Sequence, residues 1–154
     1  MRLYLVQHGL ANTEKEDPSR PLTEQGREEV KSVAERLAPL GLRIMVIWHS
    51  GKARARETAE ILAEALAPAR GIMPRGDIGP SDPVDPVASN VNAEDFDAMI
   101  VGHMPFLDKL ASLLLVNDET QPIVKFRNGG VVCLERDAER GWEINWIITP
   151  ALVS

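Results

Sequence analysis

Three apolar runs of strand length, each followed by a helical pattern, constrain the fold of this chain more than any other feature. The runs are residues 2–7, 43–49 and 96–102, and the amphipathic stretches after them reach Leu37, Leu66 and Leu115. Strands joined by helical crossovers favour a parallel sheet with helices on both faces. We therefore predict an α/β fold, a three-layer α/β/α sandwich with a mainly parallel central sheet.

The segments between and after these units complete the prediction. Thr23 is placed to cap the first helix, and Pro39 and Gly41 are placed to end it. Residues 68–86 are rich in proline and glycine, which predicts an irregular connection. Further strands are predicted at residues 123–126, 131–135 and 142–148. A chain of 154 residues is long enough to bury one core, so we expect a single domain over residues 1–154.

Composition excludes several classes of function. The chain is 44% hydrophobic and carries a net charge of −6, so its bulk field repels nucleic acid. No run approaches the roughly 18 apolar residues that span a bilayer, and the N-terminal stretch lacks the pattern of a signal peptide, so we expect a cytoplasmic protein that binds no membrane. The single Cys133 rules out an internal disulfide and is expected to be buried.

All three histidines stand at or just beyond the ends of the three predicted strands. His8 and His103 each lie beside a glycine at a turn, and His49 ends the second strand. The carboxyl ends of parallel strands share one edge of a sheet, where helix N-termini also point. Arg54 begins the second helix, where a cation opposes the helix dipole, and its planar fork suits phosphate oxygens. His8, His103 and Arg54, together with the helix ends, predict an anion site at this edge.

The sequences around these residues resemble those of the histidine phosphatase superfamily, which includes phosphoglycerate mutases and the SixA phosphohistidine phosphatases. The family's Arg-His-Gly after a strand resembles Gln7-His8-Gly9, and its Leu-Thr with a downstream glycine resembles Leu22-Thr23 and Gly26. The family's Gly-His before the third helix resembles Gly102-His103. Its Ser-x-x-x-Arg-Ala-x-x-Thr-Ala segment resembles Ser50, Arg54, Ala55, Thr58 and Ala59. The short length and the closing Asn-Trp-Ile-Ile-Thr-Pro resemble the SixA branch in particular.

The resemblance implies a phosphoglycerate mutase-like fold and a phosphatase that forms a covalent phosphohistidine intermediate on His8. Arg54 and His103 would bind the phosphoryl oxygens and stabilise their charge, with Ser50 ordering the turn that presents Arg54. The scheme needs no cofactor and no metal. The implied substrate is a phosphorylated protein histidine or a small phosphorylated compound.

One motif residue departs from the family pattern. Gln7 stands where the family has an arginine, so it is a weaker, uncharged phosphate donor. Two interpretations stay open: a nearby cation, Lys52 or Arg56, restores the charge, or the chain has become a module that binds phosphate or phosphohistidine without turnover. Lys52 is the favoured cation, because it lies two residues before Arg54.

Two further questions concern a general acid and a metal. The acid candidates are Asp77, Asp82 and Asp85 in the irregular connection. A phosphohistidine substrate relaxes the need for an acid, because its imidazole leaving group can already carry a proton. A hydrolytic metal site formed by His8, His49 and His103 is the alternative from another class, since three imidazoles can hold catalytic zinc.

Overall fold

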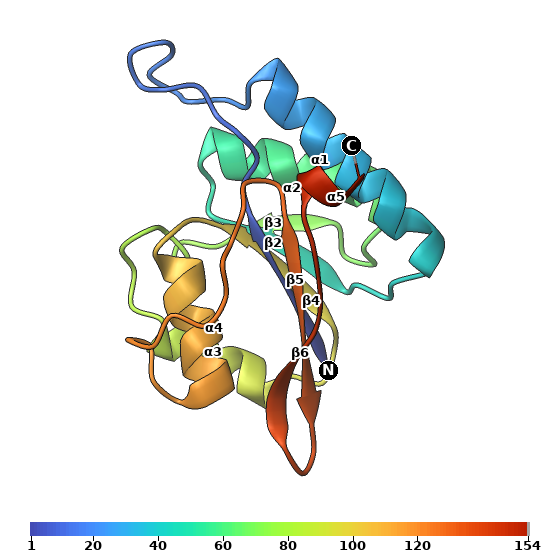
Figure 1. The fold of residues 1–154 in the computed structure, drawn as a ribbon, viewed down its shortest axis with the longest axis vertical. Coiled ribbons are helices and arrows are strands. Elements are labelled where there is room, and N and C mark those ends of the chain that lie inside the picture. The colour runs from blue at the N-terminus through green and yellow to red at the C-terminus, as the bar shows by residue number, and fades with distance from the viewer. Residues whose placement is uncertain (154) are drawn as a thin grey trace.

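The computed structural model describes residues 1–153 and has a six-stranded sheet between two layers of helices (Figure 1). In chain order the elements are β1 (Arg2–Gln7), α1 (Glu24–Leu37), the 3-10 helix η1 (Ala38–Leu40), β2 (Val46–His49), α2 (Ala53–Leu66), β3 (Ile72–Pro74), α3 (Asp85–Ala93), β4 (Ala98–Gly102), α4 (Phe106–Val116), β5 (Val131–Asp137), β6 (Gly141–Ile148) and α5 (Pro150–Val153). Within residues 1–153, no helix combines the length and apolarity needed to cross a membrane.

The sheet has the order β3-β2-β4-β1-β5-β6. The first four of these strands are parallel, and β5 and β6 form an antiparallel hairpin at the edge. The three-layer α/β fold with a mainly parallel sheet is therefore confirmed. Because β4 lies between β1 and β2, the residues that follow β1 and β4 emerge side by side at the carboxyl edge.

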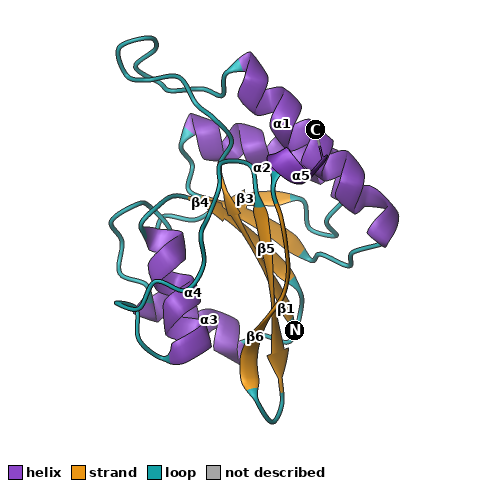
Figure 2. Cartoon of the chain, viewed as in Figure 1, coloured by secondary structure: helices purple, strands orange, loops and turns teal. Residues whose placement is uncertain are grey.

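Helices cover both faces of the sheet (Figure 2), and an apolar core lies between each helical layer and the sheet. The side chains of β1 alternate between the two cores: Leu3 and Leu5 pack on the side of α3 and α4, whereas Tyr4 and Val6 pack on the side of α1 and α2. All four are fully buried, as expected for a strand covered on both faces. Cys133 is also fully buried, in the core beside α1 and α2, as its apolar neighbours predicted.

The signals at the ends of α1 are confirmed. The Thr23 hydroxyl accepts a hydrogen bond from the backbone N–H of Gly26 at 2.9 Å, which satisfies one free donor of the first turn. The helix ends at Leu37, and the chain turns away at Gly41, whose φ of +63° suits glycine. The start of α1 is thereby held next to the loop that follows β1.

Two sequence predictions were wrong. Residues 123–126 are not a strand: Val124 and Phe126 are buried in the core beside α3 and α4, but no neighbouring strand pairs with this segment. Residues 68–86 are not irregular throughout, since they contain β3 and the start of α3. Pro86 lies in the first turn of α3, where a proline costs no helical hydrogen bond, so its presence was misleading there.

Candidate active site

The turn after β1 fixes the His8 side chain. The backbone N–H of His8 donates to Gly102 at 3.1 Å, and the Asn128 amide donates to the His8 carbonyl at 3.0 Å. The ring Nδ1 lies 2.7 Å from the Gly9 carbonyl, which can only accept, so Nδ1 carries the proton. The neutral ring therefore keeps its lone pair on Nε2, the atom that can act as a nucleophile.

His103 lies directly across from His8. It follows β4, the neighbour of β1 in the sheet, and the two ring centroids are 5.1 Å apart at an interplanar angle of 53°. Its Nε2 is 2.5 Å from the Ser50 hydroxyl, and its Nδ1 is buried without a partner within residues 1–153. Ser50 thus orients His103, and its hydroxyl also accepts from the Lys52 N–H at 3.4 Å, in the turn that leads to Arg54.

Burial and neighbouring cations keep both rings neutral. Burial lowers the pKa of His8, and the positive charges of Arg54 and Arg20 lower it further, against the opposing effect of the Gly9 hydrogen bond. Burial lowers the pKa of His103 to about 3, with His8 and Arg54 as the next causes. At neutral pH the site therefore holds a neutral imidazole pair beside cations.

These pKa shifts predict a loss of stability in acid. Below the ordinary histidine value of 6.5, the unfolded chain takes up protons that the folded site refuses, so the free energy of unfolding falls as the pH drops from 6.5 toward 3. Urea unfolding of the wild type and of His103→Asn over this range measures the effect. The wild type is expected to lose more stability with acid than the variant, and parallel curves would contradict the assignment.

Arg54 extends from the first turn of α2 and has no ion-pair partner within residues 1–153. Its Nε is buried and makes no hydrogen bond to the described residues. Burial lowers the pKa of its guanidinium, and the charge of Arg20 lowers it further. A half-buried guanidinium with a donor that no described residue satisfies is suited to bind an anion, and a phosphoryl group has the matching geometry.

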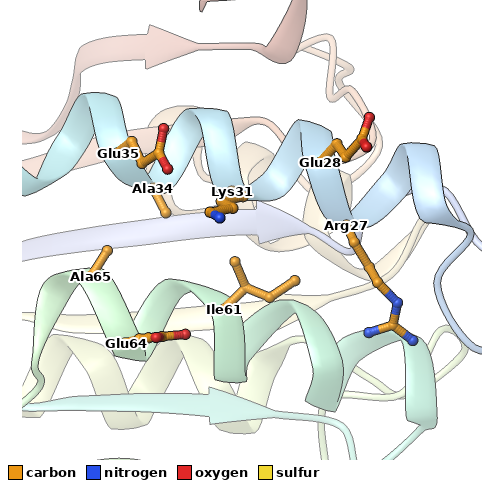
Figure 3. Close-up of a pocket in the computed structure, with 8 residues that line it drawn as sticks. All are labelled: Arg27, Glu28, Lys31, Ala34, Glu35, Ile61, Glu64 and Ala65. Carbon is orange, nitrogen blue, oxygen red and sulfur yellow. The ribbon is translucent and has the colours of Figure 1, made fainter.

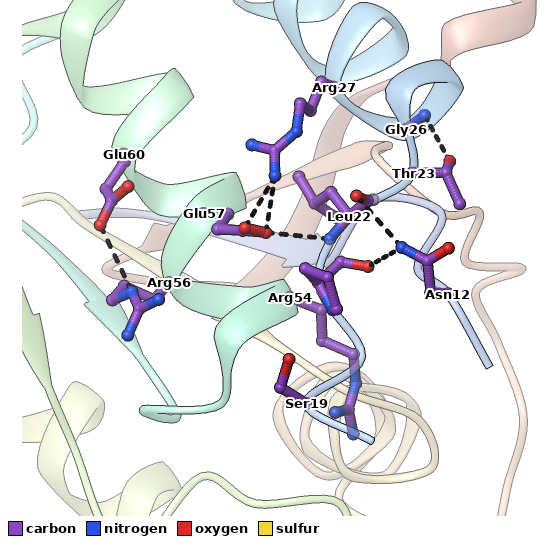
Figure 4. Close-up of polar contacts among 12 residues, drawn as sticks. Asn12, Ser19, Leu22, Thr23, Gly26, Arg27, Arg54, Arg56, Glu57 and Glu60 are labelled. Atoms are coloured by element: carbon purple, nitrogen blue, oxygen red, sulfur yellow. Dashed lines mark hydrogen bonds and ion pairs between the residues drawn. The ribbon is translucent and has the colours of Figure 1, made fainter. Parts of the chain in front are cut away.

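The loop between β1 and α1 is fastened to α2 next to Arg54 (Figure 4). The Glu57 carboxylate accepts from the backbone N–H of Leu22 at 2.9 Å and from Arg27 at 3.0 Å. The buried Thr58 hydroxyl accepts from the backbone N–H of Gly9 at 3.0 Å and donates to the Arg54 carbonyl at 2.7 Å. Thr58 therefore links the residue after His8 to the residue that presents the guanidinium.

Thr58→Val is expected to reduce the free energy of unfolding by about 2 kcal/mol, because it leaves the buried N–H of Gly9 without an acceptor. Chemical unfolding measures the change. Thr58→Ser is the matched control, since it keeps both hydrogen bonds and loses only a methyl group. The role of the hydroxyl is disproved if the valine variant is as stable as the wild type, or if the serine variant loses as much.

The two cations predicted to replace the motif arginine, Lys52 and Arg56, differ in their position relative to the site. Lys52 is the N-cap residue of α2 without a side-chain capping hydrogen bond, and its charge lowers the pKa of His103. Arg56 points away, because its guanidinium pairs with Glu60 at 3.5 Å (Figure 4). Arg56 is therefore wrong as a replacement for the missing arginine. Arg20, which the sequence did not single out, acts on His8, Arg54 and His103 alike.

The three candidate acids are also separated. Asp77 is paired with Arg75 at 2.7 Å, and that hydrogen bond lowers the pKa of its carboxyl, which disfavours proton donation. Asp85 begins α3 and lines a hollow beside Trp142. Only Asp82 shares a hollow with Ser50 and Lys52, and its carboxylate accepts from the Gly79 N–H at 2.7 Å.

The three-histidine metal site is wrong. His49 is buried, and its Nδ1 accepts a hydrogen bond from the Gly51 N–H at 3.1 Å. The charges that act on it are those of Arg56 and Glu60 on α2, not those of the His8 site. Over residues 1–153, no three histidine, cysteine or acidic side chains are grouped to hold a metal ion.

A second hollow, of about 440 Å³, lies between α1 and α2 (Figure 3). It is lined by Arg27, Glu28, Lys31, Ala34, Glu35, Ile61, Glu64 and Ala65. Arg27 is already paired with Glu57, and the carboxylates outnumber the one remaining cation. This hollow is therefore unsuited to an anion, and the candidate active site stays at the carboxyl edge of the sheet.

The family follows from comparison with known proteins. The family model for the histidine phosphatase superfamily (branch 1) matches residues 3–75, a span that contains His8 and Arg54. An uncharacterised protein of Picosynechococcus is 36% identical over 148 residues, which cover 91% of this chain and 88% of the relative. The chain belongs to the histidine phosphatase superfamily. The predicted family is therefore confirmed.

Solved structures of this superfamily have the same fold. The protein histidine phosphatase SixA, complexed with tungstate, superposes with a TM-score of 0.87 at 21% identity and covers 100% of both chains. A mycobacterial glucosyl-3-phosphoglycerate phosphatase complexed with VO3 superposes with a TM-score of 0.71 at 16% identity, over 94% of this chain and 97% of that one. The phosphoglycerate mutase-like fold is thereby confirmed, and membership of the superfamily supports a phosphatase.

Proposed function

We propose that this superfamily member is a phosphohistidine phosphatase that works through a covalent intermediate on His8. The observation that carries the proposal is the hydrogen bond from His8 Nδ1 to the Gly9 carbonyl at 2.7 Å. It leaves Nε2 unprotonated on a ring that lies 5.1 Å from His103. Burial lowers the pKa of His8, which favours the neutral form of this nucleophile at neutral pH.

In the first step, His8 Nε2 attacks phosphorus, and the bond from phosphorus to the leaving group breaks with its electron pair on the leaving group. The Arg54 guanidinium and the His103 ring bind the phosphoryl oxygens and stabilise charge as it redistributes. In the second step, water attacks the phosphorus of the intermediate. His8 then leaves as a neutral imidazole, the water proton goes to solvent, and inorganic phosphate is released.

The carboxylates favour a phosphorus–nitrogen substrate over a phosphate ester. An alcohol leaving group needs a proton donor, but Asp77 is held ionised by Arg75, and Asp82 accepts from a backbone N–H. An imidazole leaving group can carry its proton on the other nitrogen before the bond breaks. The SixA protein with the same fold is a protein histidine phosphatase, which supports a phosphorylated protein histidine as the substrate over a small phosphorylated compound.

Gln7 favours a second function, a binding module that recognises phosphate without turnover. Losing one charge-assisted contact would cost about 100-fold in rate or affinity. Under this alternative, the protein binds inorganic phosphate and releases none from any phosphoramidate.

Phosphate release from a phosphohistidine peptide and from p-nitrophenyl phosphate separates these functions. The proposal expects turnover of the peptide, slower turnover of the ester, and an acid-labile phosphoenzyme trapped by rapid quenching. Faster turnover of the ester would contradict the substrate assignment. Turnover of neither compound, with phosphate still bound, would establish the binding module.

A further inference from the structure

The first motif leaves the phosphoryl site short of one positive charge. Gln7 is the last residue of β1, where its carbonyl accepts from the Gly129 N–H at 2.9 Å. An amide at this position offers hydrogen bonds but no charge. A cation that replaces the missing one has to come from a segment other than the sheet edge.

The loop between β1 and α1, which extends past the top of the molecule in Figure 1, holds Arg20 in a defined position. Its backbone N–H donates to the Asp17 carbonyl at 2.9 Å, and its φ of +49° lies in the left-handed region, a conformation that costs about 1–2 kcal/mol for a side chain other than glycine. Its Nε donates to the Asn12 carbonyl at 3.0 Å. One edge of the guanidinium is thus tethered, which restricts the direction of the rest.

The acidic residues of this loop do not neutralise Arg20. Asp17 accepts from the backbone N–H and hydroxyl of Ser19, at 3.0 and 2.8 Å. Glu16 accepts from Thr13 in the same way. No carboxylate within residues 1–153 forms an ion pair with Arg20, so its charge is available to another anion.

The position of this charge relative to the site distinguishes Arg20 from the other cations. The residues that follow Arg20 are held close to α2: the Pro21 carbonyl accepts from the Asn12 amide at 3.1 Å, and the Leu22 N–H donates at 2.9 Å to Glu57, three residues after Arg54. In keeping with this position, the charge of Arg20 lowers the pKa of His8, of Arg54 and of His103. Figure 4 shows the same loop, at Asn12 and Ser19, beside Arg54. Lys52, the cation favoured from the sequence, acts only on His103 among these groups.

We propose that Arg20 supplies the guanidinium that position 7 lacks and binds a phosphoryl oxygen at the active site together with Arg54. The inference rests on the proposed phosphoryl binding by His8, Arg54 and His103. The loop of residues 8–22 thereby carries the nucleophile at one end and a phosphate-binding cation at the other. The Asn12 carbonyl is the fixed point between them, because it tethers Nε and leaves the two terminal nitrogens for the anion.

Arg20→Gln tests this assignment with two measurements, the affinity for inorganic phosphate by calorimetry and phosphate release from a phosphohistidine peptide. Both are expected to fall about 100-fold, as for the loss of a charge-assisted contact, with about tenfold loss in Arg20→Lys, which keeps the charge but not the fork. Arg36→Gln, on the exposed face of α1, is the matched control and is expected to change neither. The inference is overturned if the phosphate affinity and the phosphate release of Arg20→Gln both stay within twofold of the wild-type values.

Rescue separates phosphate binding from a structural role in the loop. Adding Gln7→Arg to Arg20→Gln returns a guanidinium to the site from β1, and at least a tenfold recovery of phosphate affinity is expected. No recovery means that Arg20 only orders the loop, which overturns the inference. If the wild type binds phosphate through Arg20 yet releases none from the peptide, the inference stands and the proposed function fails.

Discussion

His8→Asn is expected to reduce phosphate release from a phosphohistidine peptide by at least ~1,000-fold, because it removes the atom that forms the covalent intermediate. Asparagine keeps an N–H that can donate to the Gly9 carbonyl, so the turn after β1 retains its hydrogen bond. Affinity for inorganic phosphate is expected to stay within about tenfold, since Arg54 remains in place. Steady-state kinetics and calorimetry on the same preparation measure the two quantities.

His49→Asn is the matched control for this prediction. The residue is the last of the parallel strand β2, and the asparagine oxygen can still accept from the Gly51 N–H. Because His49 lies outside the site, turnover should remain close to that of the wild type. Equal losses in the two variants would mean that His8 acts through the stability of the sheet edge, and the covalent mechanism would be abandoned.

The sheet and its crossover helices could be predicted because burial on both faces leaves an unbroken apolar run. Ala98–Gly102 is buried along its whole length, and such a run has few alternatives to a central strand. Residues 123–126 show the limit of that reasoning. Val124 and Phe126 are as apolar and as buried as strand residues, but whether a partner strand is within reach depends on tertiary structure, which a local pattern does not contain.

The candidate site could be predicted where it depends on topology and not where it depends on side-chain direction. Strand ends gather at one edge, which was enough to bring His8 and His103 together. The same rule placed His49 in the alternative metal site, which is wrong because the His49 ring turns toward the Gly51 N–H.

Arg20 was missed for a similar reason. Its position depends on the hydrogen bond from its backbone N–H to the Asp17 carbonyl and on the hydrogen bond from its Nε to the Asn12 carbonyl. Neither contact produces a periodic pattern in the sequence. The available hint was a cation in a loop that follows a histidine motif and precedes the helix cap at Thr23.

Gly26→Ala is expected to lower the free energy of unfolding by about 3 kcal/mol, because overpacking outweighs the gain in helix propensity of about 1 kcal/mol. A Cβ at this position in α1 would lie 2.2 Å from the Leu10 carbonyl oxygen, which is backbone and cannot rotate away. That oxygen also accepts from the Thr23 N–H at 2.9 Å, so the start of α1 and the loop after His8 would move together. Urea unfolding measures the change.

Gly76→Ala is the matched control, because a Cβ there meets no atom within 4 Å and its stability should match the wild type. The same displacement predicts a loss of turnover in Gly26→Ala, since misplacement by about 1 Å costs on the order of 100-fold in rate. Gly26→Ala with both wild-type stability and wild-type turnover would show that the loop yields without cost, and it would contradict the prediction. A stable but inactive Gly26→Ala would instead place the function of this contact in positioning His8 and Arg20.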